Sequence, residues 1–507
     1  TTTRLSERVV APDDSAAGAS AGSAPTPLGQ RALRGTAVTL AGQMVRFVVQ
    51  FGSVILLARL LTPDDFGVVA MVTSVVGIAE IIRDFGLSSA AIQAKTLSQA
   101  ERSNLWWINT GIGALCTFFI VALAPLLSLV YHDDRVVGIA LVLSGLVIVS
   151  GANTQLRADL SRGMRFSSLV ITDVTAQVSA VAVAIAMALA GWGYWAVVGQ
   201  QIAFVVVGFV MNAVQCRWIP SWPDRHTPMT RFFRYGGGVL GTQLIGFATN
   251  NVDNIALGAV WGAGPLGNYS RAYQLLMVPI EQINAPMTRV VLPVLSRARE
   301  DRETFTRYVQ RAQLVGTHGL GLVFAVAAGL AWPITDILFG PQWGLVAPIF
   351  AALAIGGVFR GLVQLPYWCF LAVGKTGDQL RLYLWTRPLM ILVLLSGLPW
   401  GPIGVAIGHS VAFALYWVVS LSRMGRAADL DPAPLYAQAL RSFGLVTGPA
   451  GIAAYGVSQL VPGSVAQVVA GVSGAAAWLA IATVFIPSVR AENVALFGFL
   501  RRGLGRR

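Results

Sequence analysis

The sequence reads AVTLAGQMVRFVVQFGSVILLARL over residues 37–60 and GGVLGTQLIGFATNNVDNIALGAV over residues 237–260. Four residue pairs match at a spacing of 200 positions: Leu40 and Leu240, Gln43 and Gln243, Phe47 and Phe247, Ile55 and Ile255. The glycine that follows the first copy, Gly67, recurs as Gly267. Both segments are apolar enough to cross a bilayer, yet each carries polar residues at membrane depth. Internal repeats of this kind are typical of alternating-access transporters.

The composition predicts an all-α, polytopic integral membrane protein. Of the 507 residues, 55% are hydrophobic and only 12% are charged, whereas about a quarter of a soluble chain is charged. The apolar residues gather in runs near the ~20 residues that a membrane helix needs. We predict fourteen transmembrane helices, at residues 36–60, 66–90, 104–130, 136–156, 168–190, 193–215, 236–260, 265–288, 310–332, 346–372, 380–398, 401–422, 441–461 and 465–487.

The spans predict two pseudo-symmetric six-helix lobes around a central cavity, at residues 31–230 and 231–425, with two further helices within 426–490. Residues 1–30 are rich in Ala, Ser, Gly, Pro and Thr, without an apolar run. This composition predicts a disordered tail. Residues 491–507 end the chain in a basic tail.

The basic residues indicate the orientation of the chain in the membrane. All but seven of the 36 lysines and arginines fall in the tails and in the loops on one side; the seven are Arg46, Arg59, Arg83, Arg135, Arg271, Arg360 and Arg387. By the positive-inside rule, both termini are cytoplasmic and the protein is a multi-pass protein of the inner or plasma membrane. The rule also accounts for the net charge of +13, so nucleic acid is not needed as a partner.

No motif in the chain indicates an enzyme or a cofactor. The three cysteines are far apart in the sequence, which leaves no disulfide framework and no zinc-binding spacing. The sequence has no HExxH, and it has no soluble domain that could hold an ATPase. Transport must therefore run on an ion gradient, on the membrane potential or on consumption of the product.

Polar residues in the two repeated segments are the first candidates for a binding site. Gln43, Arg46 and Gln50 are spaced i, i+3, i+7 and share one helical face. The second copy offers Gln243, Asn250 and Asp253. Because an arginine at the bilayer centre costs at least ~2.5 kcal/mol, we expect Arg46 to face a cavity and to contact an anionic substrate. The alternative is an arginine paired with a buried carboxylate for stability.

The span at residues 265–288 extends the predicted cavity. Arg271, Gln274 and Glu281 fall on one side of this helix. Arg271 is positioned to receive a phosphate group, as is Arg360 in a later span, and Glu281 is a candidate proton site. A structural ion pair is the alternative for this helix.

Three charged residues of the second span lie at i, i+3 and i+4: Glu80, Arg83 and Asp84. They could neutralise one another within the helix, or they could form a cytoplasmic gate or ion-coupling site. Asp173 and Gln177 share a face in the fifth span, and Arg387 precedes Pro388 in the eleventh.

Several short motifs resemble those of a known family. They are LARLLTPDDFG at 57–67, DFGL at 84–87, RGMRF at 162–166, GWGYWA at 191–196, NVD at 251–253, GNYSRAY at 267–273 and LAVGK at 371–375. Together they resemble polysaccharide flippases of the MOP superfamily, of the Wzx type related to colanic acid and teichuronic acid exporters. The resemblance implies a V-shaped pair of lobes around a cavity that opens alternately to the two sides. It also implies an oligosaccharide carried on undecaprenyl diphosphate as the substrate.

The resemblance implies partners as well. These are the lipid-linked oligosaccharide, membrane lipids, H⁺ or Na⁺, and a polysaccharide polymerase with its glycosyltransferases. The competing interpretations are a cation-coupled multidrug antiporter of the same superfamily, a membrane-embedded glycan polymerase or glycosyltransferase, and a scaffold without transport activity. An antiporter of organic cations would need an acidic cavity, whereas the charges buried in the predicted spans are mainly basic.

Overall fold

The computed structural model describes residues 27–94 and 96–494, and these residues form helices and loops without a strand. The α-helices are α1 (Pro27–Leu60), α2 (Pro63–Asp84), α3 (Leu87–Gln93), α4 (Gln99–Tyr131), α5 (Arg135–Arg162), α6 (Phe166–Leu189), α7 (Trp195–Cys216), α8 (Thr230–Trp261), α9 (Ala263–Ala298), α10 (Arg302–Val315), α11 (Gly321–Gly329), α12 (Ala331–Phe339), α13 (Val346–Leu362), α14 (Gln364–Ala372), α15 (Thr376–Ser396), α16 (Gly401–Ala428), α17 (Ala433–Ser442), α18 (Gly448–Ser458) and α19 (Ser464–Phe485). One π-helical turn (Gly316–Leu320) joins α10 to α11, and another (Phe443–Thr447) joins α17 to α18.

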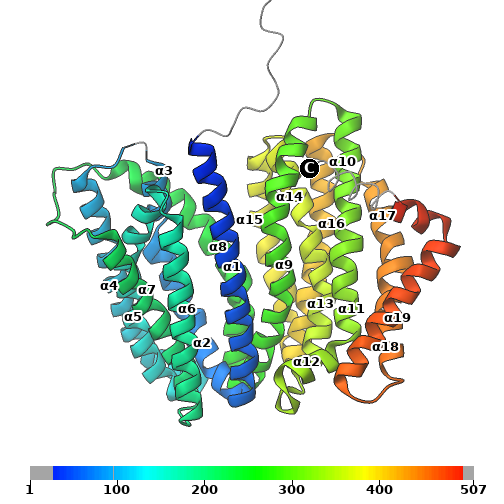
Figure 1. The fold of residues 1–507 in the computed structure, drawn as a ribbon, viewed down its shortest axis with the longest axis horizontal. Coiled ribbons are helices and arrows are strands. Elements are labelled where there is room, and N and C mark those ends of the chain that lie inside the picture. The colour runs from blue at the N-terminus through cyan, green and yellow to red at the C-terminus, as the bar shows by residue number, and fades with distance from the viewer. Residues whose placement is uncertain (1–26, 95, 495–507) are drawn as a thin grey trace, which may run out of the picture.

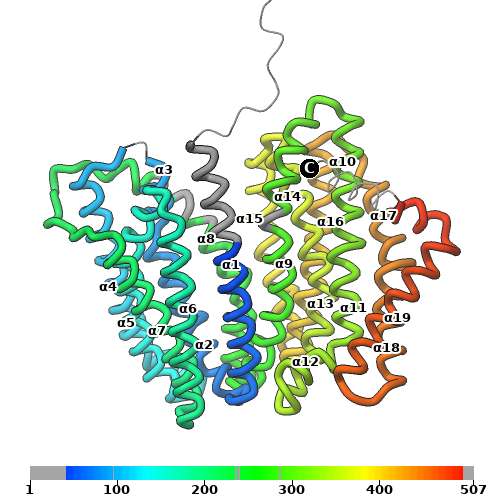
Figure 2. The backbone as a smooth tube through the Cα atoms, viewed as in Figure 1, coloured from blue at the N-terminus to red at the C-terminus, as the bar shows by residue number. Residues whose placement is uncertain are grey.

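The helices gather into two bundles that stand side by side (Figure 1). We call α1–α7 the first bundle and α8–α16 the second bundle. The helices α17–α19 lie at the outer edge of the second bundle, as the backbone trace in Figure 2 shows. In both figures α1 and α8 lie between the two groups. This arrangement agrees with the all-α, two-bundle fold predicted from the repeats.

Each predicted span coincides with a helix or with consecutive helices of the structure. Ten segments of the described chain are long and apolar enough to cross a membrane, and the predicted spans at 236–260, 265–288 and 441–461 are not among them. Helices α8 and α9 carry polar and charged residues, and the third segment is divided by a π-helical turn. A multi-pass helical membrane protein is therefore confirmed, while the count of fourteen stays a prediction.

Three boundaries of the sequence prediction change. Helix α1 begins at Pro27, so residues 27–30 of the predicted disordered tail are helical; residues 1–26 lie outside the described residues. At the other end, residues 487–494 are helical, so the predicted basic tail is described only to residue 494. The sequence placed the end of the fourth span at residue 156, but α5 continues to Arg162.

The two bundles meet tightly where α2 crosses α9. A Cβ atom added to Gly67 would lie 1.8 Å from the carbonyl oxygen of Ala263, and one added to Gly267 would lie 1.8 Å from that of Pro63. Each glycine therefore faces the first turn of the opposite helix, and only a residue without a side chain permits this approach. The repeated glycines of the sequence are the two halves of one crossing between the bundles.

Candidate functional site

A polar cavity of about 680 Å³ lies among α1, α2, α5, α6, α7 and α9. We call it the first cavity. Six of the predicted site residues line it: Arg46, Gln50, Glu80, Arg83, Arg271 and Gln274. Two of these, Arg271 and Gln274, come from α9 of the second bundle, so the cavity is completed across the two bundles.

An ion-pair network occupies one wall of the first cavity. The guanidinium of Arg157 donates to both carboxylate oxygens of Asp173, at 2.6 and 3.3 Å. Arg46 lies 3.7 Å from the same carboxylate and 5.9 Å from the ring centre of Phe204. Arg46 therefore lines the cavity and also pairs with a carboxylate that is 22% exposed, while its contact with an anionic substrate stays a prediction. One carboxylate shared by two arginines leaves this wall with net positive charge.

Two other arginines of the first cavity have free donors. The Nε atoms of Arg83 and Arg271 are buried, and neither has a hydrogen-bond partner within the part of the chain that the structure describes. The guanidinium of Arg271 lies 4.4 Å from the ring centre of Phe66. Because buried donors without partners are costly, these two guanidiniums are incompletely paired by the described residues.

The predicted local pairing within α2 is not formed. No ion pair within 4 Å joins Glu80, Arg83 and Asp84 among the described residues. Asp84 instead accepts a hydrogen bond of 2.7 Å from Ser88 and lies outside the first cavity. The turn between α2 and α3 brings Ser88 close to Asp84, so Ser88 and not Arg83 is the partner of this carboxylate.

A second cavity of about 670 Å³ lies within the second bundle. Three predicted residues, Asn250, Glu281 and Arg360, line it. Arg360 donates to the Tyr273 hydroxyl at 2.8 Å and to the Asn250 side-chain oxygen at 3.2 Å. Arg387 also lines this cavity and stacks near two tyrosine rings. The single central cavity expected from the sequence is thus represented by two cavities, one centred on each bundle.

Three further predicted residues line neither cavity. Gln43 and Gln243 are exposed elsewhere on α1 and α8. Asp253 is only 1% exposed and accepts a hydrogen bond of 2.7 Å from the Tyr269 hydroxyl. This carboxylate is buried between α8 and α9 and does not line the second cavity.

The sequence reasoning missed several residues of the first cavity, most clearly Arg157. It assigned Arg157 to a cytoplasmic loop because the apolar run ends near residue 156. The structure continues α5 through this position and turns Asn153, Thr154 and Arg157 toward the cavity. Their spacing of i, i+1 and i+4 places them on one helical face, and this was the available signal. Gln200 and Gln201 of α7 were missed as well.

The bundles are sealed at the end where α1 terminates. The carbonyl of Ala58 accepts hydrogen bonds of 2.7 Å from the Trp343 indole and from the Gln342 amide. Arg59 donates to the carbonyl of Ile337 at 2.5 Å. Residues of the first bundle are therefore joined to the segment after α11, and the glycine crossing lies beside these contacts.

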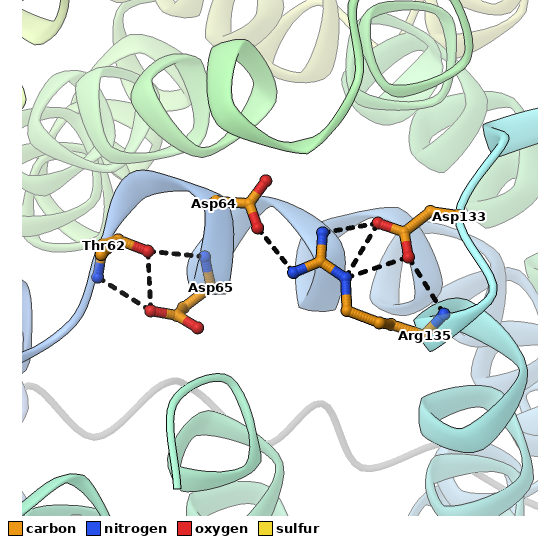
Figure 3. Close-up of polar contacts among 5 residues, drawn as sticks. All are labelled: Thr62, Asp64, Asp65, Asp133 and Arg135. Atoms are coloured by element: carbon orange, nitrogen blue, oxygen red, sulfur yellow. Dashed lines mark hydrogen bonds and ion pairs between the residues drawn. The ribbon is translucent and has the colours of Figure 1, made fainter. Parts of the chain in front are cut away.

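Charged groups brace the starts of α2 and α5 at this end, as Figure 3 shows. Arg135 contacts Asp64 and Asp133, each at 2.6 Å. These hydrogen bonds from Arg135 lower the pKa of Asp133. Thr62 and Asp65 form a capping box, which satisfies free N–H groups at the start of α2. The network holds the first turn of α2 in place for its crossing with α9.

Two bundles of membrane helices that hold charged cavities and contact each other at one end are the arrangement expected of a membrane transporter. Two solved structures share this fold. The lipid II flippase MurJ, in an inward closed conformation, superposes with a TM-score of 0.70 at 13% identity, covering 87% of this chain and 98% of that one. An inward-facing MATE family multidrug transporter of the MOP superfamily gives 0.56 at 15% identity, covering 77% and 98%.

Sequence comparison places the protein more narrowly. The family model described as "Polysaccharide biosynthesis protein" matches residues 56–348, more than half of the chain, and the chain belongs to this family. The teichuronic acid biosynthesis protein TuaB of Bacillus subtilis is 27% identical over 75% of this chain and 79% of its own length. WzxC of Escherichia coli, a lipopolysaccharide biosynthesis protein, is 22% identical over 72% and 74%. The succinoglycan biosynthesis transport protein ExoT of Rhizobium meliloti is 22% identical over 73% and 74%.

Proposed function

We propose that this protein flips lipid-linked oligosaccharides across the inner or plasma membrane by alternating access. The substrate we propose is an oligosaccharide unit on undecaprenyl diphosphate, destined for a cell-surface polysaccharide. The observation that carries the proposal is the first cavity. Among the described residues, its lining holds four arginines, Arg46, Arg83, Arg157 and Arg271, against two acids, Glu80 and Asp173. An anionic head group would find charged donors there to replace its hydration shell.

The mechanism we propose keeps the lipid tail in the bilayer while the head group crosses. With both termini cytoplasmic, the sealed end of the bundles is the outer end. The head group would then enter the first cavity from the cytoplasmic side, and separation of α2 from α9 would release it outward. Moving anions outward gains ~2.3 kcal/mol per charge for each 100 mV of inside-negative potential. Coupling to H⁺ or Na⁺ would use Asp253, which contacts Tyr269 of α9, or Glu281, which lines the second cavity.

The names of the relatives support the substrate class, because TuaB, WzxC and ExoT are described as polysaccharide biosynthesis or transport proteins. A polysaccharide polymerase and glycosyltransferases would then act before and after this protein. The antiporter alternative is supported only by the fold shared with a multidrug transporter. The excess of arginine in the first cavity argues against it, since organic cations would be repelled.

The proposal is tested in proteoliposomes that contain a fluorescently labelled undecaprenyl-diphosphate oligosaccharide. An added membrane-impermeant quencher reports how much label reaches the outer leaflet over time. We expect Arg83→Gln and Arg271→Gln each to slow flipping by roughly 10- to 150-fold, because hydrogen bonds to charged groups contribute about 1.5–3 kcal/mol. Arg307→Gln is the matched control, since Arg307 is exposed on α10 and lines neither cavity.

Normal flipping by both cavity variants would refute the role of these arginines. Exchange of an organic cation against a proton or sodium gradient, with no movement of the glycolipid, would favour the antiporter. Lengthening of the glycan in the same vesicles would instead favour a polymerase.

A further inference from the structure

A third concave site lies outside both cavities, where α15 begins and α16 ends. It encloses about 260 Å³ and is lined by four basic side chains: Lys375, Arg381, Arg423 and Arg426. The one acidic residue in its wall is Asp378, which lies 3.8 Å from Arg381. We call this site the basic pocket. Its lining carries a net charge of +3, and all four basic side chains are exposed to an incoming ligand.

The backbone adds to this positive field. Helix α15 begins at Thr376, beside the basic pocket, and runs for 21 residues. Lys375 occupies its N-cap position and provides no side-chain cap. The first N–H groups of a helix without a cap carry partial positive charge and attract anions, phosphate groups in particular. Four cations and a helix start therefore point at one small concavity.

An apolar groove continues from the basic pocket along α15 and α16. Trp385 lines both sites, and the groove continues over Thr386, Leu389, Met390, Val393, Ala412, Leu415, Tyr416 and Val419. The guanidinium of Arg423 lies 5.8 Å from the ring centre of Trp385, at the junction of the two sites. The groove is shallow, about 30 Å³, and nearly all of its lining is apolar.

The groove lies on a face of the second bundle that bears many exposed apolar side chains. Leu384, Leu392, Val411 and Val418 are each 44–65% exposed. In a chain with membrane helices, such a face contacts lipid tails. The other side of α15 presents Tyr383 and Arg387 to the second cavity. The groove therefore opens on the lipid-facing surface, with Tyr416 between it and the second cavity, and neither the basic pocket nor the groove shares a lining residue with the first cavity.

We propose that the basic pocket and the groove together bind an anionic glycerophospholipid. The phosphate is held by the four basic side chains and the start of α15, and one acyl chain lies in the groove below Trp385. The charge of the pocket selects an anionic head group, and its continuity with an apolar groove selects a lipid over a soluble phosphate. Basic pockets between membrane helices are suited to this type of ligand. The proposal does not depend on flippase activity.

The test is native mass spectrometry of the full-length protein released from detergent micelles. Phosphatidylglycerol and phosphatidylcholine with identical acyl chains are added in equal amounts, and retained lipid is counted. We expect the wild-type protein to retain phosphatidylglycerol preferentially. In the double variant Arg423→Gln/Arg426→Gln we expect roughly 30-fold weaker retention, which corresponds to about 1 kcal/mol for each basic residue removed.

The matched control is Arg307→Gln/Arg311→Gln, which removes the same charge from exposed positions on α10 that line no described pocket. The single variant Arg426→Gln provides a milder change if the double variant melts early. Equal retention of the two lipids, or equal loss in the control, would overturn the proposal. Displacement of bound lipid by glycerol 3-phosphate at the same concentration would also overturn it, since the groove would then contribute nothing.

Discussion

Replacement of either crossing glycine by alanine is expected to weaken the seal between the two bundles. In Gly67→Ala the new Cβ atom would lie 1.8 Å from the carbonyl oxygen of Ala263, whereas real Cβ contacts are essentially never under 3.0 Å. The obstructing atom is backbone, so no side-chain rotation can relieve the contact. The helices α2 and α9 must therefore move apart.

The cost follows from this geometry. Overpacking of a close contact costs about 1–3 kcal/mol, and the better helix propensity of alanine cancels because α2 is helical in both forms. We expect a shift of about 1–3 kcal/mol against the sealed arrangement, which is roughly 5- to 150-fold in the equilibrium between sealed and open forms. Gly267→Ala should act in the same way against Pro63. The double variant should cost less than the sum of the two, because both changes act on one crossing.

The assay uses a cysteine at Leu57, in a background without Cys116, Cys216 and Cys369. Leu57 is 2% exposed, lines the first cavity and lies next to Ala58 in the seal. A membrane-impermeant maleimide added from the outer side should label this cysteine roughly 5- to 150-fold faster in Gly67→Ala. The control is Gly145→Ala on α5, where an added Cβ meets nothing within 4 Å. Unchanged labelling in Gly67→Ala, or equal acceleration in the control, would refute this reasoning.

Two further predictions concern charged residues. Asp173→Asn should change the free energy of unfolding by no more than about 1 kcal/mol, because the arginines paired with Asp173 are 42% exposed and such pairs contribute little. The same variant should bind the lipid-linked diphosphate more tightly in the first cavity, because a negative charge is removed. Unchanged affinity in a titration would contradict this expectation. Arg135 donates hydrogen bonds to Asp133 and lowers its pKa in the folded protein. Asp133 therefore stabilises the fold at pH values above its unfolded-state pKa of about 3.9. This contribution is lost as the pH falls through the lower folded-state pKa. The difference in melting temperature between wild type and Asp133→Asn should therefore shrink below about pH 4, and a constant difference from pH 6 to pH 3 would show that the contact contributes nothing.

The repeat at a spacing of 200 positions was the most informative feature of the sequence for predicting the fold. It predicted two related bundles, and the structure has them. The recurrence of Gly67 as Gly267 was visible in the sequence, but its meaning was not. Only the packing of α2 on α9 shows that each glycine faces the start of the other's helix.

The candidate site was predicted in part. Helical spacing correctly placed Arg46 with Gln50, and Arg271 with Gln274, on common faces. The same reasoning grouped Glu281 with Arg271, yet these residues line different cavities because α9 passes from one bundle's cavity to the other's. It omitted Arg157 because hydropathy measures where an apolar run ends, whereas a helix that lines a polar cavity continues beyond that point.

Composition and periodicity alone indicated the membrane class, the all-α fold, the repeat and the basic character of the buried charge. These properties depend on composition and on periodicity within one helix, which are local. Helix packing established which polar faces share a cavity, that Arg46 and Arg157 share Asp173, and that the Nε donors of Arg83 and Arg271 lack partners among the residues that the structure describes. The physical reason is that helical spacing orients a side chain around its own axis and contains no information about the helix it faces. That neighbour is set by packing between segments far apart in the chain.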